Sequence, residues 1–328
     1  MKIGAVISSS DPQRVIHYVI KELEVYHDVV VYQFPLFKSP IFYYRINPLL
    51  KKYDFIRFMH KCDVLFFDWA SDMLAYATHL PKQCAIVTRL VSYELFQWAP
   101  KVNWDAVDKI ILVSHAMQRR FVEYFPEHAI KTVVIYNGTS LNKFFPQADR
   151  QFQFNLGMLC SISPIKRVYE VIPLLFQLRE YGFDATLHIA GKPAGDPRYE
   201  VALKRMINKF DLDSRVIFYG QIDDPFNWLK NIDIFISNSF WEGQQFALIE
   251  AMASGCFCLS HFWDGADEVL PKENLYLTES ELLQKIVAYS QKSQFEKLDL
   301  QSQMRNIACE KFDIEHTKIA IRQMIDSM

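Results

Sequence analysis

The sequence predicts an α/β protein with two domains, each built on a mainly parallel sheet. Strand-like apolar runs alternate with helical patterns along most of the chain, which is typical of parallel strands joined by helices. The alternation is interrupted once, by the turn signal Asn137-Gly138 and the polar residues that follow Pro146. The length of 328 residues also exceeds what most single domains hold.

We expect the first domain over residues 1–142, a linker at 143–150 and the second domain over 151–311. The strands expected in the first domain lie at 2–8, 27–34, 64–67, 85–88 and 110–113, with helical patterns between several of them. The strands expected in the second domain lie at 156–161, 185–190, 216–219, 232–237 and 256–260. Helices are expected there from Pro164, near 199–210 and around Glu250.

Composition favours a packed globular protein that does not bind nucleic acid. Half of the residues are hydrophobic and 15% are aromatic, which is enough for a large core. The formal charge of −2 lacks the basic excess typical of nucleic-acid-binding proteins. The start M-K-I-G-A-V-I-S has a strand pattern rather than that of a signal peptide, and no run of about 18 apolar residues is present. We therefore expect a cytoplasmic protein without a membrane span.

The six cysteines are expected to be reduced thiols. Only Cys256 and Cys258 are close in sequence, and their spacing fits alternation along a strand. His261 follows, but no fourth ligand stands at a spacing typical of structural zinc. The sequence therefore predicts no zinc site.

A turn with two cations follows the first strand of the second domain. Ser163 suits a helix N-cap and Pro164 the first helical position, so Lys166 and Arg167 would fall in the first turn. Positive charge there opposes the helix dipole, which is tolerable on a surface and useful where an anion binds. Taken alone, Lys166 fits a solvated side chain as well as a phosphate ligand.

A glycine-bearing loop, H-I-A-G-K-P-A-G, follows the next strand over 188–195. Gly191 would let backbone N–H groups approach a phosphate or ribose closely. Taken alone, the loop is better explained as an ordinary turn.

The stretch S-F-W-E-G-Q-Q-F-A-L-I-E-A-M-A-S-G-C over 239–256 runs from a loop into a helix that we expect to begin at Gln245 or Phe246. The N-terminus of that helix offers backbone N–H groups and a positive dipole end, which suit a diphosphate. Glu242 would reach the sugar side of such a ligand, and Glu250, about a turn and a half into the helix, would accept hydrogen bonds from ribose hydroxyls. Ligands of open α/β sheets bind beyond the carboxyl ends of strands, and each of these loops follows an expected strand.

The stretch from Glu242 to Glu250 resembles the E-x(7)-E signature of family 4 retaining glycosyltransferases. These enzymes have the GT-B fold, in which two Rossmann-like domains face each other across a cleft. Further segments are similar to parts of that family: V-I-Y-N-G-T-S-L-N-K-F-F-P (134–146) to the interdomain segment, S-I-S-P-I-K-R (161–167) to the phosphate-binding loop, and W-D-G-A-D-E-V-L (263–270) to a later loop. The tail from Phe312 resembles a final helix, so we expect residues 312–328 to cross back onto the first domain.

The resemblance implies the transfer of a sugar from a nucleotide-diphosphate-sugar to a hydroxyl acceptor, which is a glycan, a lipid-linked molecule or a small molecule, as in polysaccharide biosynthesis. It implies that Glu250 holds the ribose, Glu242 lies by the donor sugar and Lys166 neutralises the leaving diphosphate, so that no metal or other cofactor is needed. The anomeric configuration is kept through front-face attack. The other donor-binding positions that it implies are Ser161, Arg167, Gly191, Gly243, Gln244, Gln245, Phe246 and Ala247. On the acceptor side it implies Ser8, Ser9 and Arg89.

Three positions depart from the family's pattern. Ser161 stands where the phosphate loop usually has an arginine, and Val91 stands where the first domain often has a histidine near the donor sugar. Ser8-Ser9-Ser10-Asp11 replaces the usual glycine-rich turn. These departures leave a second hypothesis open, a non-catalytic nucleotide-sugar-binding subunit of a glycosylation complex. A third hypothesis is another reaction on the same architecture, such as sugar-nucleotide epimerisation.

The stretch Phe42–Lys61 mixes aromatic residues with five Lys or Arg residues and one acid. In related enzymes with lipid-linked acceptors, basic and apolar patches of the first domain contact the membrane, and a basic amphipathic helix can lie on an anionic surface. One interpretation is therefore peripheral contact with the inner face of the membrane. The other, which we favour, is an ordinary helix whose aromatic side chains pack inward while its lysines stay in water.

Overall fold

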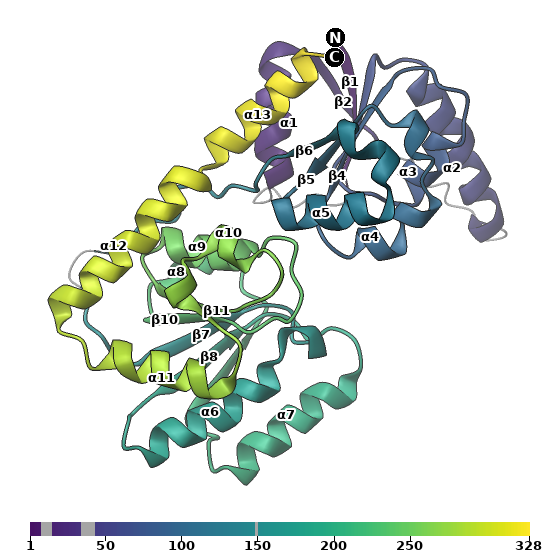
Figure 1. Cartoon of the computed structure of the whole chain (residues 1–328). Helices are drawn as coiled ribbons and strands as arrows, with labels where there is room; N and C mark the ends of the chain where they lie inside the picture. Colours follow the sequence, from purple (N-terminus) through teal and green to yellow (C-terminus); the bar gives the residue numbers. More distant parts are fainter. Residues whose placement is uncertain (8–14, 34–42, 148–149) are drawn as a thin grey trace. The chain divides into compact units, whose positions relative to one another are not determined.

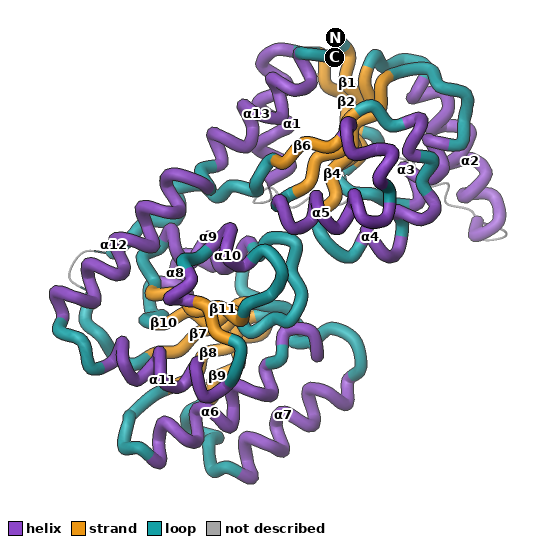
Figure 2. Tube along the Cα trace, viewed as in Figure 1, coloured by secondary structure: helices purple, strands orange, loops and turns teal. Residues whose placement is uncertain are grey.

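The computed structural model describes residues 1–7, 15–33, 43–147 and 150–328 and divides into two compact units (Figure 1). Unit 1 comprises residues 1–137 together with 315–328, and unit 2 is the continuous segment 138–314. Each unit contains a parallel sheet with helices around it (Figure 2), as the sequence predicts.

Unit 2 begins earlier than the second domain expected from the sequence. The Arg305 guanidinium donates hydrogen bonds to the carbonyl groups of Leu141 at 3.2 Å and Phe144 at 2.6 Å. The Phe145 ring also packs on Phe226, with 4.6 Å between ring centroids. Much of the expected linker is therefore fixed to unit 2 by hydrogen bonds and ring contacts.

Within the described residues, unit 1 has a six-stranded sheet in the order β2-β1-β3-β4-β5-β6, and its strand pairs are parallel. The strands are β1 (Lys2–Val6), β2 (Asp28–Val31), β3 (Val64–Phe67), β4 (Ala85–Leu90), β5 (Lys109–Leu112) and β6 (Thr132–Val134). The helices are α1 (Val15–Tyr26), α2 (Tyr43–Met59), α3 (Asp72–Thr78), α4 (Glu94–Gln97), α5 (His115–Tyr124) and α13 (Ile314–Asp326), with 3₁₀ turns at Ala99–Lys101, Trp104–Ala106 and Pro126–Lys131. β3 is buried along its whole length because helices cover both faces of the sheet.

Helix α13 packs against α1, although nearly the whole chain separates them in sequence (Figure 1). Glu22 of α1 pairs with Arg322 at 3.2 Å and with Lys318 at 3.6 Å. His27 Nε2 lies 2.9 Å from Asp326 Oδ1. These contacts join α13 to the N-terminal part of unit 1.

Among the residues that the structure describes, unit 2 also has a six-stranded parallel sheet, in the order β12-β11-β10-β7-β8-β9. The strands are β7 (Asn155–Leu159), β8 (Thr186–Ala190), β9 (Val216–Gly220), β10 (Ile234–Ser237), β11 (Phe257–His261) and β12 (Leu275–Tyr276). The helices are α6 (Val168–Glu180), α7 (Pro197–Lys209), α8 (Pro225–Leu229), α9 (Phe246–Ala253), α10 (Ala266–Val269), α11 (Glu279–Ser290) and α12 (Gln294–Lys311), with 3₁₀ turns at Pro164–Lys166 and Lys272–Asn274. Helices α6, α7 and α11 pack on one face of the sheet, and α8, α9 and α10 lie on the other (Figure 1).

The strand order of unit 2 reverses between β7 and β10. From β7 the chain moves to β8 and β9 on one side and then returns to β10 on the other side of β7. The connections after β7 and β10 leave in opposite directions, and open α/β sheets bind ligands beyond the carboxyl ends of the strands at such a reversal. The corresponding reversal in unit 1 lies between β1 and β3.

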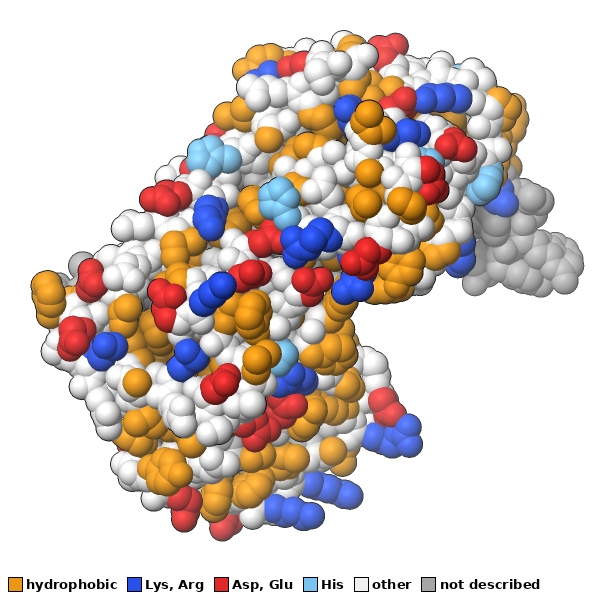
Figure 3. Space-filling view, viewed as in Figure 1, with side chains coloured by type: hydrophobic (Ala, Val, Ile, Leu, Met, Phe, Trp, Pro, Cys, Tyr) orange, Lys and Arg blue, Asp and Glu red, His pale blue; other side chains and the backbone are white. Residues whose placement is uncertain are grey.

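Within the described part of the chain, no helix has the length and apolar character needed to cross a membrane. From Leu50 onward, Phe55 and Met59 of α2 are buried, while Lys52 and Arg57 are exposed. The buried Phe55 agrees with the interpretation of an ordinary helix, whereas Tyr53 is 63% exposed; Phe42 lies outside the described residues. Acidic and basic side chains are interspersed over the face seen in Figure 3, consistent with the charge of −2.

Candidate functional site

The turn after β7 differs from the helix start expected at Pro164. Pro164–Lys166 form a single 3₁₀ turn, and α6 begins only at Val168. Arg167 lies between them with φ 50° and ψ 40°. This is the left-handed region, which costs a non-glycine residue about 1–2 kcal/mol. Ser163-Pro164 is a sound start signal for a helix, but the apolar periodicity after it does not mark the left-handed residue.

The side chain of Arg167 is bound to Glu170. Its Nε and one terminal nitrogen lie 2.7 and 2.5 Å from Glu170 Oε2, and both side chains are 16% exposed. The guanidinium is therefore engaged within the protein. Ser161, at the position where the family usually has an arginine, is exposed, and the predicted roles of Ser161 and Arg167 in donor binding stay predictions.

Asn238 and Tyr276 extend this network into the core. Asn238 Nδ2 donates to the Arg167 carbonyl oxygen at 2.9 Å and to Glu170 Oε2 at 3.1 Å. Tyr276 donates its hydroxyl proton to Asn238 Oδ1 at 2.9 Å. Asn238 and Tyr276 are 3% and 2% exposed. Sequence reasoning missed Glu170, Asn238 and Tyr276; the one available signal was a polar residue, Asn238, directly after the fully buried strand β10.

Lys166 and Glu242, the two residues predicted to be catalytic, form an ion pair between Nζ and Oε1. Their side chains are 17% and 12% exposed. Nearby, the Phe240 N–H donates to the Ile165 carbonyl oxygen at 3.2 Å. The loops after β7 and β10 therefore meet at the point where the strand order reverses, where α/β sheets bind ligands.

Helix α9 begins at Phe246, as the sequence predicts, and Gln245 is its N-cap. The Gln245 side chain makes no capping hydrogen bond, and its Oε1 is buried without a hydrogen-bond partner among the described residues. Gly243 and Gln244 are buried, whereas Ala247 is half-buried and Phe246 is 37% exposed. A buried acceptor without a partner is costly, so a donor from a ligand would stabilise this site. Glu250, half-buried, lies in the second turn of the helix.

Gly191 is required by backbone packing. Its φ is 137°, and a Cβ at this position would lie 1.8 Å from the Cys160 carbonyl oxygen. Its N–H already donates to the Gly220 carbonyl oxygen at 2.7 Å. The close approach predicted for this glycine is thus to the turn after β7, and its predicted role in donor binding stays a prediction.

In unit 1 the predicted acceptor-side residue Arg89 is only 3% exposed. Its guanidinium lies 2.5 Å from Asp68 Oδ1 and also donates to Asn137 Oδ1. Arg89 thus joins the carboxyl ends of β3 and β4 to the segment after β6. Ser8 and Ser9 lie outside the described residues.

Two titratable side chains near Lys166 and Arg167, Cys160 and His261, are shifted toward their neutral forms. Burial raises the pKa of the Cys160 thiol to about 12, so this cysteine is not a thiolate nucleophile near neutral pH. Burial lowers the pKa of His261, and the charge of Arg167 lowers it further. Within the part of the chain that the structure describes, no three His, Cys, Asp or Glu side chains gather as a metal site.

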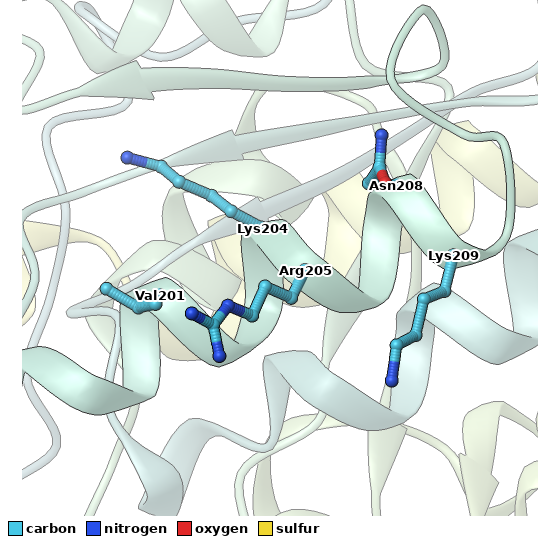
Figure 4. Close-up of a pocket in the computed structure, with 5 residues that line it drawn as sticks. All are labelled: Val201, Lys204, Arg205, Asn208 and Lys209. Atoms are coloured by element: carbon cyan, nitrogen blue, oxygen red, sulfur yellow. The ribbon is translucent and has the colours of Figure 1, made fainter.

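A hollow lies on the surface of α7 and is lined by residues of this helix (Figure 4). Its residues are Val201, Lys204, Arg205, Asn208 and Lys209. Because α7 runs back from the carboxyl end of β8, these last turns lie away from the loops that carry Lys166 and Glu242. The hollow does not belong to the candidate site.

Comparison with known proteins finds similarity to glycosyltransferases over part of the chain. Residues 154–291 match the family model described as Glycosyl transferases group 1. Protein CapJ of Staphylococcus aureus is 24% identical over 176 residues, which are 52% of this chain and 44% of CapJ. The capsular polysaccharide biosynthesis glycosyltransferase CapH of the same organism is 26% identical over 157 residues, 46% of this chain and 42% of CapH. The matches span less than half the length of these two relatives.

Among solved structures, Anabaena Alr3699/HepE in complex with UDP and glucose matches with a TM-score of 0.82 and 20% identity, and the match covers 100% of both chains. The chain has the GT-B fold. The family model and this likeness together support a GT-B glycosyltransferase, and the matched segment 154–291 contains every donor-side residue predicted from the sequence.

Proposed function

We propose that this chain is a family 4 retaining glycosyltransferase that transfers a sugar from a UDP-sugar to a hydroxyl acceptor without a metal ion. The observation that carries the proposal is the contact between Lys166 and Glu242 where the strand order reverses. The choice of uridine is supported by the likeness to HepE, which is known in complexes with UDP and with UDP-glucose.

Lys166 and the start of α9 are suited to a diphosphate leaving group. Breaking the bond between the sugar and the diphosphate leaves negative charge on the phosphate oxygens, and an ammonium group with fixed N–H donors stabilises that charge. The N-terminus of α9 adds partial positive charge through Gly243–Ala247. When the donor binds, Lys166 exchanges the Glu242 carboxylate for phosphate oxygens, and Glu242 becomes available to the sugar hydroxyls.

The remaining donor contacts follow from the polar groups of α9. Glu250 accepts hydrogen bonds from the ribose hydroxyls. Gln245 Oε1, buried without a partner among the described residues, accepts another hydroxyl of the donor. Specificity for the donor then arises because the acceptor groups of the site find hydrogen-bond donors only when these hydroxyls are present.

In the transfer step, an acceptor hydroxyl oxygen attacks the anomeric carbon on the face from which the diphosphate leaves. The bond from the anomeric carbon to the phosphate oxygen breaks, the new glycosidic bond forms, and the hydroxyl proton passes to the departing phosphate oxygen. The configuration at the anomeric carbon is retained. Neither Glu242 nor Glu250 needs to act as a base.

The direct test is donor-dependent release of UDP, measured with UDP-glucose and then with other UDP-sugars, in wild type and in Glu250→Ala. We expect release by wild type and a large loss in the variant. NMR of the product would show the retained configuration, and release that persists in EDTA would show metal independence. Absence of release with every common nucleotide-sugar would overturn the proposal.

One observation favours a second candidate, a nucleotide-sugar-binding subunit without turnover. Arg167 is bound to Glu170, and Ser161 supplies no charge. Of the cations of this turn, Lys166, which pairs with Glu242, is therefore left to neutralise a leaving diphosphate. Calorimetry that shows tight binding of UDP-sugars, with no transfer to extracts containing candidate acceptors, would favour this candidate.

The acceptor class is supported only by relatives. CapH is named for capsular polysaccharide biosynthesis, so a growing polysaccharide or its lipid-linked precursor is the acceptor class to test first. Contact of Phe42–Lys61 with the inner membrane face remains a weaker proposal. It would be removed by failure to co-sediment with anionic vesicles at low salt.

A further inference from the structure

The backbone that presents Lys166 is held from outside its own turn. The carbonyl of the next residue, Arg167, accepts a hydrogen bond from Asn238 Nδ2 at 2.9 Å. Asn238 lies in the loop after β10, 71 residues away in sequence. The turn is thus attached to that loop at the Lys166 side chain, through Glu242, and at the carbonyl of the following residue.

Glu170 completes this attachment by two interactions. Its Oε2 accepts from the Arg167 guanidinium at 2.7 and 2.5 Å and from Asn238 Nδ2 at 3.1 Å. The first contact holds the side chain of a left-handed residue against the first turn of α6. The second orients the side-chain amide of Asn238, which also donates a hydrogen bond to the Arg167 carbonyl oxygen. Tyr276 fixes the same amide from the opposite end, at Oδ1.

We propose that Glu170 and Asn238 are positioning residues for Lys166. They stabilise the left-handed conformation of Arg167 and so direct the Lys166 ammonium toward the diphosphate. This inference rests on the proposed function, because it concerns the same anion site. It adds residues outside the E-x(7)-E stretch and assigns Arg167 a conformational role instead of a phosphate contact.

The roles of Arg167 and Glu170 can be separated because glycine adopts left-handed conformations at no steric cost. If Arg167 were a phosphate ligand held back by Glu170, Arg167→Gly would lose affinity and Glu170→Gln would gain it. If Glu170 acts by holding the turn, Glu170→Gln loses activity, and Arg167→Gly in the same chain restores it.

The experiment measures UDP binding by calorimetry and UDP release from UDP-glucose for wild type, Glu170→Gln, Asn238→Ala and Glu170→Gln/Arg167→Gly. We expect Glu170→Gln and Asn238→Ala to lower kcat about tenfold, because a small displacement of a catalytic group is costly, with a smaller change in KM. The double variant returns to within about threefold of wild type. Glu180→Gln, an exposed glutamate at the other end of α6, is the matched control.

A second set of variants tests whether the effect passes through Lys166. In a Lys166→Gln background, Glu170→Gln should lower kcat less than twofold further, because residues that act as a unit are non-additive. Thermal unfolding of each variant reports any general loss of structure, which the glycine rescue would not repair.

The outcomes separate the two proposals. Suppose that wild type binds UDP. The positioning role alone is then overturned if Glu170→Gln leaves kcat unchanged, or if the effects of Glu170→Gln and Lys166→Gln on kcat are fully additive. Tighter UDP binding by Glu170→Gln assigns Arg167 to the phosphate and also overturns it. If wild type binds none of UDP, GDP and ADP, both proposals fail together.

Discussion

The two units use the same architecture but treat their charged residues differently. In unit 1 the Arg89–Asp68 pair, at the carboxyl ends of β4 and β3, is enclosed, with 4% exposure of each side chain. In unit 2 the Lys166–Glu242 pair, beyond the carboxyl ends of β7 and β10, keeps 17% and 12% exposure. A charge that is fully enclosed and paired holds a structure together, whereas one that keeps access to solvent can exchange its partner for a ligand.

Arg89 and Lys166 differ in their bonding partners as well as in their exposure. Arg89 binds both Asp68 and Asn137, so its donors already have acceptors within unit 1. Lys166 contacts a carboxylate next to a helix N-terminus that carries a buried, unpartnered acceptor, Gln245 Oε1, within the described residues. We expect substitutions in unit 1 to change stability and matching substitutions in unit 2 to change chemistry.

The largest expected effect is on stability, in Arg89→Met. Removing this guanidinium breaks a buried ion pair with Asp68, which costs about 3–5 kcal/mol. Urea unfolding, monitored by hydrogen exchange of unit 1 amides, measures the loss in free energy of unfolding. Lys82→Met is the control, because its pair with Asp108 at 2.6 Å is 47% and 32% exposed and exposed pairs contribute about 0–1 kcal/mol. Equal effects of the two substitutions would contradict the comparison.

Lys166→Ala, in contrast, is expected to lower activity and to leave stability nearly unchanged. Loss of a preorganised charge at the leaving group should lower the rate of UDP release about 10²- to 10³-fold, with a small change in melting temperature. Lys192→Ala, an exposed lysine in the loop after β8, is the control and should leave the rate unchanged. A rate loss below tenfold would show that Lys166 is not the group that stabilises the diphosphate.

Glu250→Gln sharpens the comparison within unit 2. A hydrogen bond to a charged acceptor is about twice as strong as a neutral one, so UDP should bind about five- to tenfold more weakly while the fold is kept. Calorimetry with UDP measures this change, and Glu273→Gln, an exposed glutamate, is the control. Unchanged affinity would remove Glu250 from the ribose site.

The smallest effect concerns pH. Burial lowers the pKa of His188 below its ordinary 6.5, so the unfolded chain takes up a proton at higher pH than the folded one. Stability is therefore lost as pH falls from 6.5 toward the folded pKa. His188→Gln should make the urea midpoint of unit 2 fall less between pH 7 and pH 5 than it falls in wild type. An unchanged pH slope in His188→Gln would contradict this.

Features of the fold that depend on local sequence pattern were predicted correctly. The start of α9 at Phe246 follows from a Trp-Glu-Gly turn before an apolar helical face. The meeting of the loops after β7 and β10 follows from parallel strands having their carboxyl ends at one edge.

What the sequence did not predict depends on contacts between distant residues. The left-handed Arg167 is stabilised by Asn238, which is 71 residues away, and the helical pattern that begins at Pro164 carries no trace of it. Arg89 resembled a ligand-binding arginine, but its burial is set by Asp68 and Asn137, which lie 21 and 48 residues away. Periodicity and capping rules act over a few residues and cannot report such partners.

The discontinuity of unit 1 also has a consequence for biosynthesis. Residues 138–314 form unit 2 as one continuous segment, whereas unit 1 needs α13, which the ribosome makes only after all of unit 2. During translation, at about 5–20 residues per second, the face of α1 that carries Glu22 stays uncovered until α13 emerges. A premature stop before Ile314 would therefore leave this face uncovered while unit 2 keeps nearly all of its residues.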